Sequence, residues 1–373
     1  MPDLSLIILS AGNSRRFETQ VKKQWIRIKD EPLWKFVAKR FTDLHEFDNV
    51  IITASEKEIN YMQKHSDHTF IVGGKTRQES LKNALSLVKT SHVIVTDVAR
   101  SCIPNEMIQR IIDAKSKADI IVPYLSVNDT VVYKNETIDR DEVRLIQTPQ
   151  LSKTTVLTKA LEQKEIFTDD SSAVKSIDGT VFYEKGSIKA KKITRYDDLD
   201  KLECLSGPLK TTFVGIGFDV HQFCKDKKMF LGGVLIDSPF GFLAHSDGDV
   251  ALHSLIDALL GAIGAGDIGE LFPDNDDRYK NLDSKVMLQD VVTFVREVGF
   301  EINNVDLTIM AETPRLSTYK DEMRRVIASI LKIEKIKVNI KATTTEKLGF
   351  IGRKEGVAVE AVASLHYFNW KKI

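Results

Sequence analysis

Cysteine is scarce in this chain, and the few cysteines are far apart. The 373 residues include three, Cys102, Cys204 and Cys224, and no two of them form a CxxC pair. This spacing predicts neither a disulfide framework nor a thiolate metal site. It fits a reducing compartment, and we expect a cytoplasmic protein.

An excess of charge of one sign is also missing. Lys+Arg 53 and Asp+Glu 53 leave a formal net charge of +0. The chain therefore has no global field that would attract nucleic acid or an anionic membrane, and we expect neither as a partner. Any phosphate chemistry must depend on local clusters of charge.

Long apolar runs and two common nucleotide motifs are absent as well. The run at residues 4–9 has no basic leader and is too short for a signal sequence or a membrane span, so we interpret it as a buried strand. Neither a GxGxxG fingerprint nor a Walker-type loop occurs, and the chain has no kinase signature.

The length of the chain predicts two domains. Up to about residue 205, apolar β-rich runs alternate with helical stretches, which is typical of a parallel α/β sheet. After Gly207-Pro208, consecutive strands with grouped helices favour an α+β layer. We therefore expect a Rossmann-like α/β domain over 1–206, a linker over 207–211 and an α+β (ferredoxin-like) domain over 212–373.

The expected elements follow from these patterns. In the first domain we expect strands at 4–9, 50–53, 93–96, 120–122, 131–133, 180–183 and 192–194, and helices at 34–44, 76–89, 104–117 and 196–205. In the second we expect strands at 212–220, 229–236, 304–311, 336–342 and 356–367, and helices at 247–263, 284–298 and 316–331.

Three loops of the first domain have phosphate-binding character. They are residues 10–17, 73–80 and 96–100, each after a predicted strand or apolar run, and Lys22-Lys23-Gln24 adds cations. Backbone N–H groups of such loops can bind phosphates while arginines neutralise their charge. Asp97 suits a Mg²⁺ ligand, because hard cations use carboxylates together with substrate phosphates. Taken singly, the first loop fits a surface turn equally well, and Asp97 fits a cap.

These loops, with Asp129-Thr130, Thr148-Pro149-Gln150 and Thr168-Asp169-Asp170, resemble the motifs of the 2-C-methyl-D-erythritol 4-phosphate cytidylyltransferases over about residues 4–205. The resemblance implies a nucleotidyltransferase that uses CTP and holds Mg²⁺ on Asp97. It implies catalytic roles for Arg16, Lys23, Arg140 and Lys192. The implied CTP-binding residues are Ala11, Gly12, Asn13, Gly74, Arg77 and Ser80, and the implied methylerythritol phosphate ligands are Arg100, Thr130, Arg140, Thr148 and Thr168. Ser14, Lys22, Val98 and Ser101 depart from the family pattern.

Asp219, His221 and His253 form a potential metal site in the second domain. Period-two alternation points Asp219 and His221 to one face of a strand, and His253 follows on a predicted helix with Ser246 as its N-cap. One carboxylate and two imidazoles are a ligand set of catalytic zinc, although Mn²⁺ or Fe²⁺ would also fit. His253 taken alone is more often an ordinary core or surface histidine.

Residues 215–221, 244–253 and 342–350 resemble the motifs of the 2-C-methyl-D-erythritol 2,4-cyclodiphosphate synthases nearly letter for letter, and 266–274 and 352–356 match too. The likeness, over about 213–366, implies Zn²⁺ on Asp219, His221 and His253 and a second divalent ion on Glu346. It implies transition-state stabilisation by His245 and Thr344. The implied substrate-binding residues are Asp267, Ile268, Gly269, Phe272, Asp274, Asp276, Ala311, Arg315, Thr343, Phe350 and Arg353.

Together the two resemblances imply a bifunctional enzyme of non-mevalonate isoprenoid precursor synthesis. It would transfer CMP from CTP to 2-C-methyl-D-erythritol 4-phosphate and release pyrophosphate. It would also cyclise 4-CDP-2-C-methyl-D-erythritol 2-phosphate to the 2,4-cyclodiphosphate and release CMP. A separate kinase must act between these steps. The resemblance further implies a homo-oligomer, with a trimer through the second domain and room for higher association through the first.

Two other interpretations stay open at this point. One is a sugar-phosphate nucleotidyltransferase fused to a metal phosphohydrolase, and the other is a regulatory protein that binds phosphometabolites without turnover. Arg16, Lys23, Lys192 and the complete set of metal ligands argue against the second of these.

Overall fold

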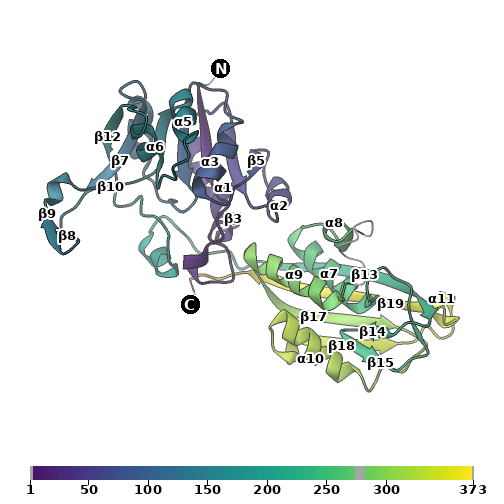
Figure 1. The fold of residues 1–373 in the computed structure, drawn as a ribbon. Helices are drawn as coiled ribbons and strands as arrows, with labels where there is room; N and C mark the ends of the chain where they lie inside the picture. Colours follow the sequence, from purple (N-terminus) through teal and green to yellow (C-terminus); the bar gives the residue numbers. More distant parts are fainter. Residues whose placement is uncertain (1–2, 274–281, 372–373) are drawn as a thin grey trace. The chain divides into compact units, whose positions relative to one another are not determined.

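The computed structural model describes residues 3–273 and 282–371, and the chain divides into two units. The first unit runs to Gly207 and includes the end of the chain from Trp370, and the second unit is Pro208–Asn369. Figure 1 shows the first unit in purple to teal and most of the second in green to yellow. Among the described residues, no helix combines the length and apolarity needed to cross a membrane.

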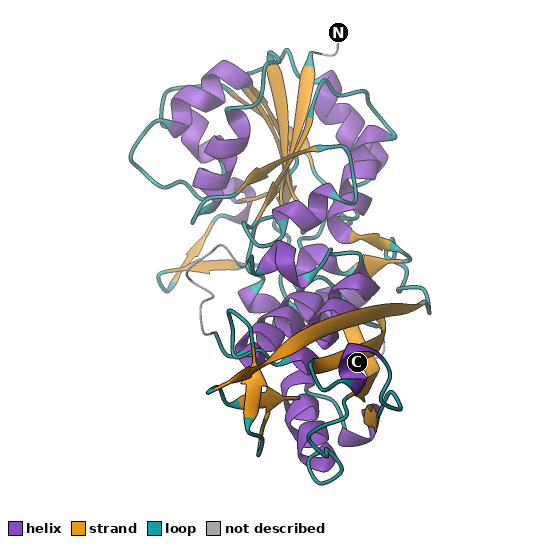
Figure 2. Cartoon of the chain, turned by 90° about the vertical axis from the view of Figure 1, so that its right-hand side faces the viewer, coloured by secondary structure: helices purple, strands orange, loops and turns teal. Residues whose placement is uncertain are grey.

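The first unit is built on an eight-stranded sheet with helices on both sides (Figure 2). Strands β1, β4, β5 and β6 are parallel, whereas β11 is antiparallel to both β6 and β7. The strand order is β10-β7-β11-β6-β1-β4-β5, with β12 beside β7. The strands are β1 (Leu4–Leu9), β4 (Val50–Ala54), β5 (Thr69–Val72), β6 (His92–Asp97), β7 (Ile120–Ser126), β10 (Arg144–Ile146), β11 (Gln150–Lys153) and β12 (Val181–Lys185).

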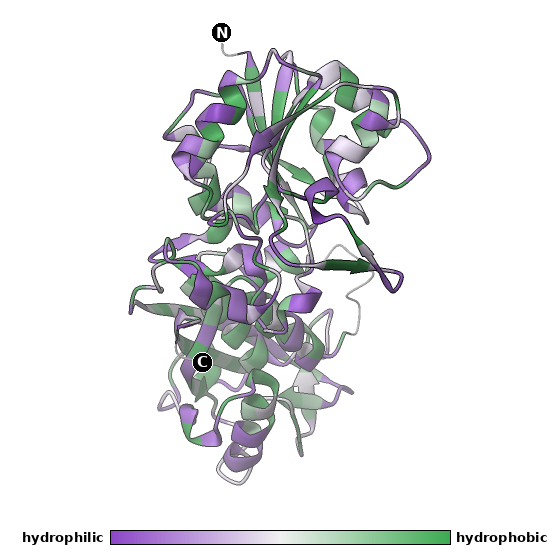
Figure 3. Cartoon of the chain, turned by 90° about the vertical axis from the view of Figure 1, so that its left-hand side faces the viewer, coloured by the Kyte–Doolittle hydropathy of each residue, from purple (hydrophilic) through white to green (hydrophobic). Residues whose placement is uncertain are grey.

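Burial explains these strands and the helices that cover them. Every residue of β1 is buried, as expected for a strand covered on both faces. Apolar residues concentrate on strands and inner helix faces, with hydrophilic residues on the outer loops (Figure 3). Helix α3 starts with a capping box in which Thr76 and Glu79 bind each other's backbone N–H. The helices are α1 (Leu33–Thr42), α2 (Ile59–Gln63), α3 (Arg77–Leu85), α4 (Asn105–Asp113), α5 (Thr154–Leu161) and α6 (Asp170–Lys175).

A ligand crevice is expected where the central strands β1 and β6 of this sheet end. Strand β1 pairs with β4 on one side and β6 on the other, and its last residue, Leu9, lies beside Asp97 at the end of β6. The loops after β1 and β6 therefore leave the sheet at neighbouring points, where α/β sheets bind ligands. Outside this sheet lie the hairpins β2 (Arg27–Ile28) with β3 (Glu31–Pro32), and β8 (Val131–Tyr133) with β9 (Glu136–Ile138).

The second unit has a mixed five-stranded sheet in the order β16-β13-β19-β17-β18. Helix α7 packs closely on β13, since a Cβ on Gly217 would lie 1.9 Å from the Ser254 carbonyl oxygen. The strands of the second unit are β13 (Thr212–Lys225), β14 (Met229–Leu231), β15 (Val234–Ile236), β16 (Phe240–Phe242), β17 (Phe300–Met310), β18 (Val338–Thr343) and β19 (Gly356–Tyr367). Its helices are α7 (Val250–Ile263), α8 (Ile268–Leu271), α9 (Ser284–Glu297), α10 (Lys320–Leu331) and α11 (Gly349–Gly352).

The predicted fold class is confirmed, but several elements differ. Residues 192–194 form no strand, and the expected strand at 229–236 is the hairpin β14–β15. Helix α7 begins after Asp249, whose carboxylate accepts from the Leu252 N–H, so Ser246 is not its N-cap. The expected domain 212–373 also differs from the second unit at its end, because Trp370 groups with the first unit.

The cysteine prediction is wrong for one pair. Cys102 and Cys204 form a disulfide with a Cα–Cα distance of 5.7 Å, and Cys224 is free. Their sequence separation of 102 residues hid the contact, because the chain returns to the loop after β6 only once the whole sheet is complete.

Candidate functional site

A pocket of about 240 Å³ opens where β1 and β6 end. It is lined by backbone and side chains of two loops, the Lys23-Gln24 turn, and the segment before the short helix at Tyr196–Lys201. Five predicted site residues are among those lining it: Gly12, Arg16, Lys23, Asp97 and Lys192. Most of its charged side chains are cationic, which suits a ligand with several phosphates.

Asp97 lies at the centre of an ionic network. Its carboxylate lies 2.7 Å from Lys192 Nζ and 3.4 Å from Arg77 Nε. Arg77 also binds the buried carboxylate of Asp170 with two bonds, at 2.6 and 3.3 Å. Burial is the largest influence on the Asp97 pKa and raises it, but Arg77 and Lys192 outweigh burial and bring the pKa to about 2. Asp97 is therefore anionic at neutral pH.

Lys23 is the most perturbed cation of the pocket. Burial, followed by repulsion from Lys192 and Arg16, lowers its pKa to about 8. Its ammonium donates at 2.6 Å to the carbonyl of Ile193, whose neighbours Lys192 and Thr194 line the pocket. Three cations therefore lie close enough to repel one another, an arrangement that an incoming polyphosphate would relieve.

The turn that contains Lys23 is anchored on a fully buried carboxylate, Glu58. Glu58 accepts from Gln24 Nε2 at 3.2 Å and from the Trp25 indole N–H, and it lies 3.4 Å from Lys22 Nζ. Lys22, which departs from the family pattern, therefore has a buried partner. Ser14, a second departure, has a left-handed backbone at φ 50°, and its hydroxyl accepts from the Lys23 N–H at 3.0 Å.

The loops at 10–17 and 73–80 touch next to the pocket. A Cβ on Gly73 would lie 2.4 Å from the Ala11 Cβ, so only glycine fits there. Ser80 Oγ accepts from the Gly74 N–H at 3.0 Å, which places Ala11, Gly74 and Ser80 together. Ser80 therefore shapes the loop in this structure.

Other predicted residues of the first domain are not among those that line this pocket. Thr130 and Arg140 are exposed next to the β8–β9 hairpin, where Arg140 donates to the Asn128 carbonyl. Arg100 donates to the Ala190 carbonyl at 2.6 Å, and Thr148 is buried with no hydrogen-bond partner for its hydroxyl in the part of the chain that the structure describes. The remaining two, Asn13 and Thr168, are exposed.

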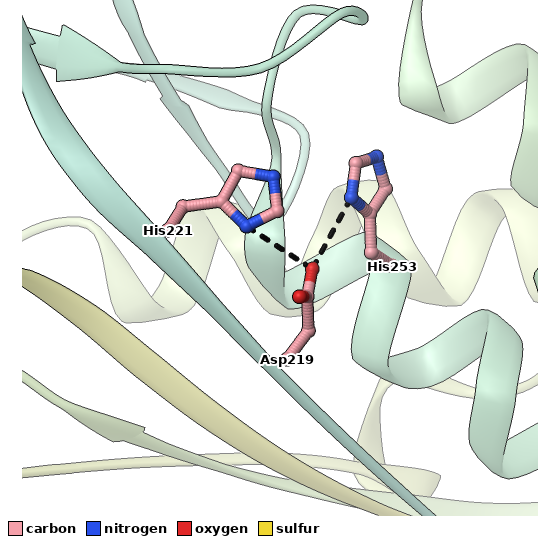
Figure 4. Close-up of side chains that lie close together, drawn as sticks. All are labelled: Asp219, His221 and His253. Carbon is pink, nitrogen blue, oxygen red and sulfur yellow. Dashed lines mark ion pairs between the residues drawn. The ribbon is translucent and has the colours of Figure 1, made fainter. Parts of the chain in front are cut away.

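In the second unit the structure brings Asp219, His221 and His253 together (Figure 4). Their ligand atoms lie within 4.8 Å of one another, and Asp219 Oδ2 is 3.2 Å from His221 Nδ1 and 3.3 Å from His253 Nδ1. Burial, the largest influence, raises the Asp219 pKa, but the two histidines outweigh it and hold the pKa well below its usual range. Asp219 and His221 share a face of β13 with Gly215 and Gly217, which let α7 and His253 approach.

The side chains around this cluster fit a metal ion. His221 Nδ1 is buried and makes no hydrogen bond of acceptable geometry to a described residue, so this atom can serve as a ligand of a cation between the three residues. His253 Nε2 lies 2.9 Å from Ser284 Oγ, and Ser284 in turn donates to Asp247. Such a partner on the second ring nitrogen fixes the tautomer and orientation of a metal-binding histidine.

The loop at 343–350 does not join the cluster. Thr343, Thr344, Glu346 and Phe350 are exposed, and Thr344 Oγ1 donates to Glu346 at 3.0 Å. Glu346 and Lys347 have left-handed backbones, and the Glu312 carboxylate holds this bend by accepting from the N–H groups of Thr345 and Lys347. Glu346 is thus presented outward from its own chain.

The remaining predictions are dispersed. Asp267 caps helix α8 and Asp257 of α7 accepts from the Ile268 N–H at 2.8 Å, which fixes the loop at 267–269 beside α7. His245 and Arg315 are exposed, and Arg353 pairs with Glu355 at 2.9 Å. Phe272 and Ala311 are half-buried, Gly269 is exposed, and Asp274 and Asp276 lie outside the described residues.

Sequence reasoning missed Glu58, Asp170, Glu312 and Trp370. Asp170 belongs to the Thr168-Asp169-Asp170 motif, but the sequence does not reveal its ion pair with Arg77. No pattern in the sequence marks the other three, because their partners are distant along the chain or belong to irregular loops.

Comparison with known proteins agrees with this geometry. Residues 4–206 match the 2-C-methyl-D-erythritol 4-phosphate cytidylyltransferase family, and residues 212–366 match the YgbB family. The bifunctional enzyme IspD/IspF of Aliarcobacter butzleri is 56% identical over 373 residues and that of Nitratiruptor sp. is 53% identical, each covering 100% of both chains. The solved bifunctional IspDF of Campylobacter jejuni has a TM-score of 0.89 at 46% identity and covers 99% of this chain and 100% of that chain.

Both reactions therefore reside in one chain. It transfers CMP from CTP to 2-C-methyl-D-erythritol 4-phosphate, and it forms the 2,4-cyclodiphosphate with release of CMP, in the non-mevalonate route to isoprenoids. Enzymes of this kind use divalent metal ions. The chain belongs to the family of bifunctional enzymes that join a methylerythritol phosphate cytidylyltransferase to a cyclodiphosphate synthase.

Proposed function

We propose that the pocket between β1 and β6 is where CMP transfer occurs, with Arg16, Lys23 and Lys192 around the reacting phosphates. Attack of the methylerythritol phosphate oxygen on the α-phosphorus of CTP builds negative charge and expels pyrophosphate, so fixed cations lower the barrier. Ala11, Gly12, Asn13, Gly74 and Ser80 would hold the nucleotide. Arg77 would act on it through Asp97, to which it is already bound.

Arg100, Thr130, Arg140, Thr148 and Thr168 would hold methylerythritol phosphate. Arg140 and Thr130 lie next to an exposed hairpin whose Val132 and Tyr133 are 62% and 60% exposed. An apolar hairpin of this kind suits a contact with a second copy of the chain, and we include association through the first domain in the proposal.

The carboxylate of Asp97 would hold Mg²⁺ together with substrate phosphates. The low pKa of Asp97 keeps it anionic, and the hard carboxylate oxygen suits this ion. When bound, the ion would supply further neutralisation of the phosphates.

In the second unit, Asp219, His221 and His253 would hold Zn²⁺, and Glu346 a second divalent ion between substrate phosphates. When bound, zinc would act as a Lewis acid and a template for the folded-back substrate. His245 and Thr344 would stabilise charge as the 2-phosphate attacks the β-phosphorus and CMP leaves. The residues proposed to contact the substrate are Asp267, Ile268, Gly269, Phe272, Asp274, Asp276, Ala311, Arg315, Thr343, Phe350 and Arg353.

The single observation that supports this metal assignment is the convergence of three ligand atoms within 4.8 Å, with His221 Nδ1 left unbonded. We expect chelation to abolish CMP release and Zn²⁺ to restore it. Asp219→Asn should weaken zinc retention, because a neutral amide is a poorer ligand. Metal analysis of dialysed protein measures this, and full zinc occupancy with full activity in Asp219→Asn would refute the assignment.

The second domain would assemble as a trimer. Val214, Ile216, Phe218 and Val220 alternate along β13 on the face away from α7, and they are 61%, 65%, 58% and 40% exposed. A row of four large apolar side chains on one strand suits burial against other copies. The outward loop with Glu346 would then complete the metal-containing site of a neighbour.

A separate kinase would connect the two reactions, because the product of the first and the substrate of the second differ by one phosphoryl group. We also propose a cytoplasmic location, on the ground that the enzyme uses CTP and not on the cysteines, since Cys102 and Cys204 form a disulfide.

A further inference from the structure

The end of the chain belongs to the first unit, although the preceding residues belong to the second. The indole ring of Trp370 is 1% exposed. Its Nε1–H donates to the Arg27 carbonyl at 2.8 Å, and its own carbonyl accepts from the Tyr196 hydroxyl. A cytidylyltransferase domain that ended at residue 206 would lack this side chain.

Each of the two residues bound by Trp370 contacts one of the two turns that contain the proposed catalytic cations. The Tyr196 ring lies 5.7 Å from the Phe17 ring, and Phe17 directly follows Arg16 in the turn Arg15–Phe17. The Arg27 guanidinium lies 5.7 Å from the Trp25 ring, and Trp25 closes the turn Lys23–Trp25. One residue therefore supports both sides of the pocket, its side chain through Arg27 and its carbonyl through Tyr196.

These turns depend on such support. Each is a single 3₁₀ turn of three residues, too short to be stable by itself. The turn with Arg16 is flanked by two non-glycine residues in left-handed conformations, Ser14 at φ 50° and Glu18 at φ 55°. Such conformations cost energy and persist only where surrounding contacts hold them.

We propose that Trp370 is a positioning residue for CMP transfer: the last part of the chain, which follows the cyclodiphosphate synthase sequence, holds the Arg16 and Lys23 turns of the other active site in place. The inference rests on the proposed roles of Arg16 and Lys23. Because catalysis here depends on the placement of charges, a small displacement of either turn lowers the rate of the chemical step.

The test uses full-length Trp370→Ala and Trp370→Phe, with kcat and KM measured for pyrophosphate release and CMP release measured in parallel. We expect Trp370→Ala to lower kcat for pyrophosphate release about ten- to a hundred-fold, with a smaller change in KM for CTP. CMP release from supplied substrate should be unchanged. Trp370→Phe keeps an aromatic ring but loses the bond to Arg27, and it should lie in between.

Leu157→Ala is the matched control for lost stability. Leu157 is fully buried in the same unit, within a core cluster that includes neither turn. It should lower the melting temperature yet retain kcat below that temperature. An equal loss of kcat in Leu157→Ala and Trp370→Ala would overturn the inference, because general loosening would then explain both.

Tyr196→Phe keeps the test decisive if Trp370→Ala does not fold. It removes only the hydroxyl that donates to the Trp370 carbonyl, and it should lower kcat while CMP release persists. Unchanged kcat in both Trp370→Phe and Tyr196→Phe would overturn the inference. Arg16→Ala in the same series separates the two levels: if it also retains kcat, the proposed roles of the pocket residues fail first.

Discussion

Lys23 gives the first reaction a pH dependence. Burial, Lys192 and Arg16 bring its pKa to about 8, so its positive charge is complete well below that pH and is lost as the pH rises through it. We expect kcat/KM for pyrophosphate release to fall above about pH 8 as one proton is lost, because this constant reports the free enzyme. Lys23→Arg should move that fall to higher pH, since arginine keeps its charge.

The pH dependence of folding stability should have the opposite sign to that of the rate. The pKa of Lys23 is lower in the folded chain than its ordinary value, so the unfolded chain binds more protons between the two values. This group therefore makes the folded state more stable as the pH rises through that window. If kcat/KM and the melting temperature both fell as the pH rises through this window, the pH dependence could not be assigned to Lys23.

Glu58 and Lys22 should act as a unit. Removing one partner of a buried pair typically costs about 3–5 kcal/mol, and Glu58 is fully buried beside the turn with Lys23. Glu58→Gln should therefore lower both the free energy of unfolding and kcat for pyrophosphate release, and Lys22→Gln in the same chain should restore part of each. Denaturant unfolding and steady-state kinetics measure the two effects.

Glu184→Gln serves as the control for this pair. Glu184 is 3.2 Å from Arg110, whose side chain is 41% exposed, and exposed pairs contribute about 0–1 kcal/mol. If the effects of Lys22→Gln and Glu58→Gln on the free energy of unfolding and on kcat simply added in the double variant, the two side chains would not be coupled.

At the scale of elements, the two faces of strand β13 have different roles. Gly215, Gly217, Asp219 and His221 face α7, whereas Ile216 and Phe218 point away from it and are exposed. Strict alternation in one strand therefore determines both the metal cluster and the proposed subunit contact. The neighbour of Phe218 on β19 is Glu360, also exposed, which places one acid in an otherwise apolar area.

Phe218→Lys should disrupt this contact. A lysine at this position in every copy would be buried and would repel its counterparts at a symmetric interface, so we expect a smaller assembly and reduced CMP release, with pyrophosphate release retained. Sedimentation or native mass spectrometry measures the assembly. Leu235→Lys, at a residue 52% exposed on β15, is the matched change away from that row and should leave the assembly intact. An unchanged assembly in Phe218→Lys would exclude this face as the contact.

Prediction from sequence worked where the signal is local to an element. The mostly apolar run of β1 and the Asp-x-His spacing on β13 each follow from side-chain periodicity, so the buried strand and the shared face of Asp219 and His221 could both be predicted. It failed where the partner is remote. Cys102 with Cys204, Arg77 with Asp170 and Trp370 with Arg27 are separated by 102, 93 and 343 residues, and no periodicity connects them.

For the whole molecule, we expect the two reactions to depend on separate sets of residues in one chain, although the first unit takes in both Met1–Gly207 and the end of the chain from Trp370. Lys29 N–H donates to the Gly207 carbonyl, and a Cβ on Gly207 would lie 3.3 Å from the Lys371 side chain, so Lys29, Gly207 and Lys371 lie together within the first unit. A fragment 1–206 lacks Trp370 and should be less active than the full chain.

The most direct measurement is a crossed assay of Lys192→Ala and His253→Ala in the full chain, with pyrophosphate release and CMP release followed separately on supplied substrates. Lys192→Ala should lower pyrophosphate release about 10²–10³-fold and leave CMP release unchanged, because it removes one preorganised charge from one site. His253→Ala should lower CMP release and leave pyrophosphate release unchanged. Lys191→Ala, which removes the neighbouring lysine paired with Asp198 at 3.1 Å, should affect neither reaction. If Lys192→Ala or His253→Ala lowered both reactions equally, the assignment of each reaction to its own residues would be wrong.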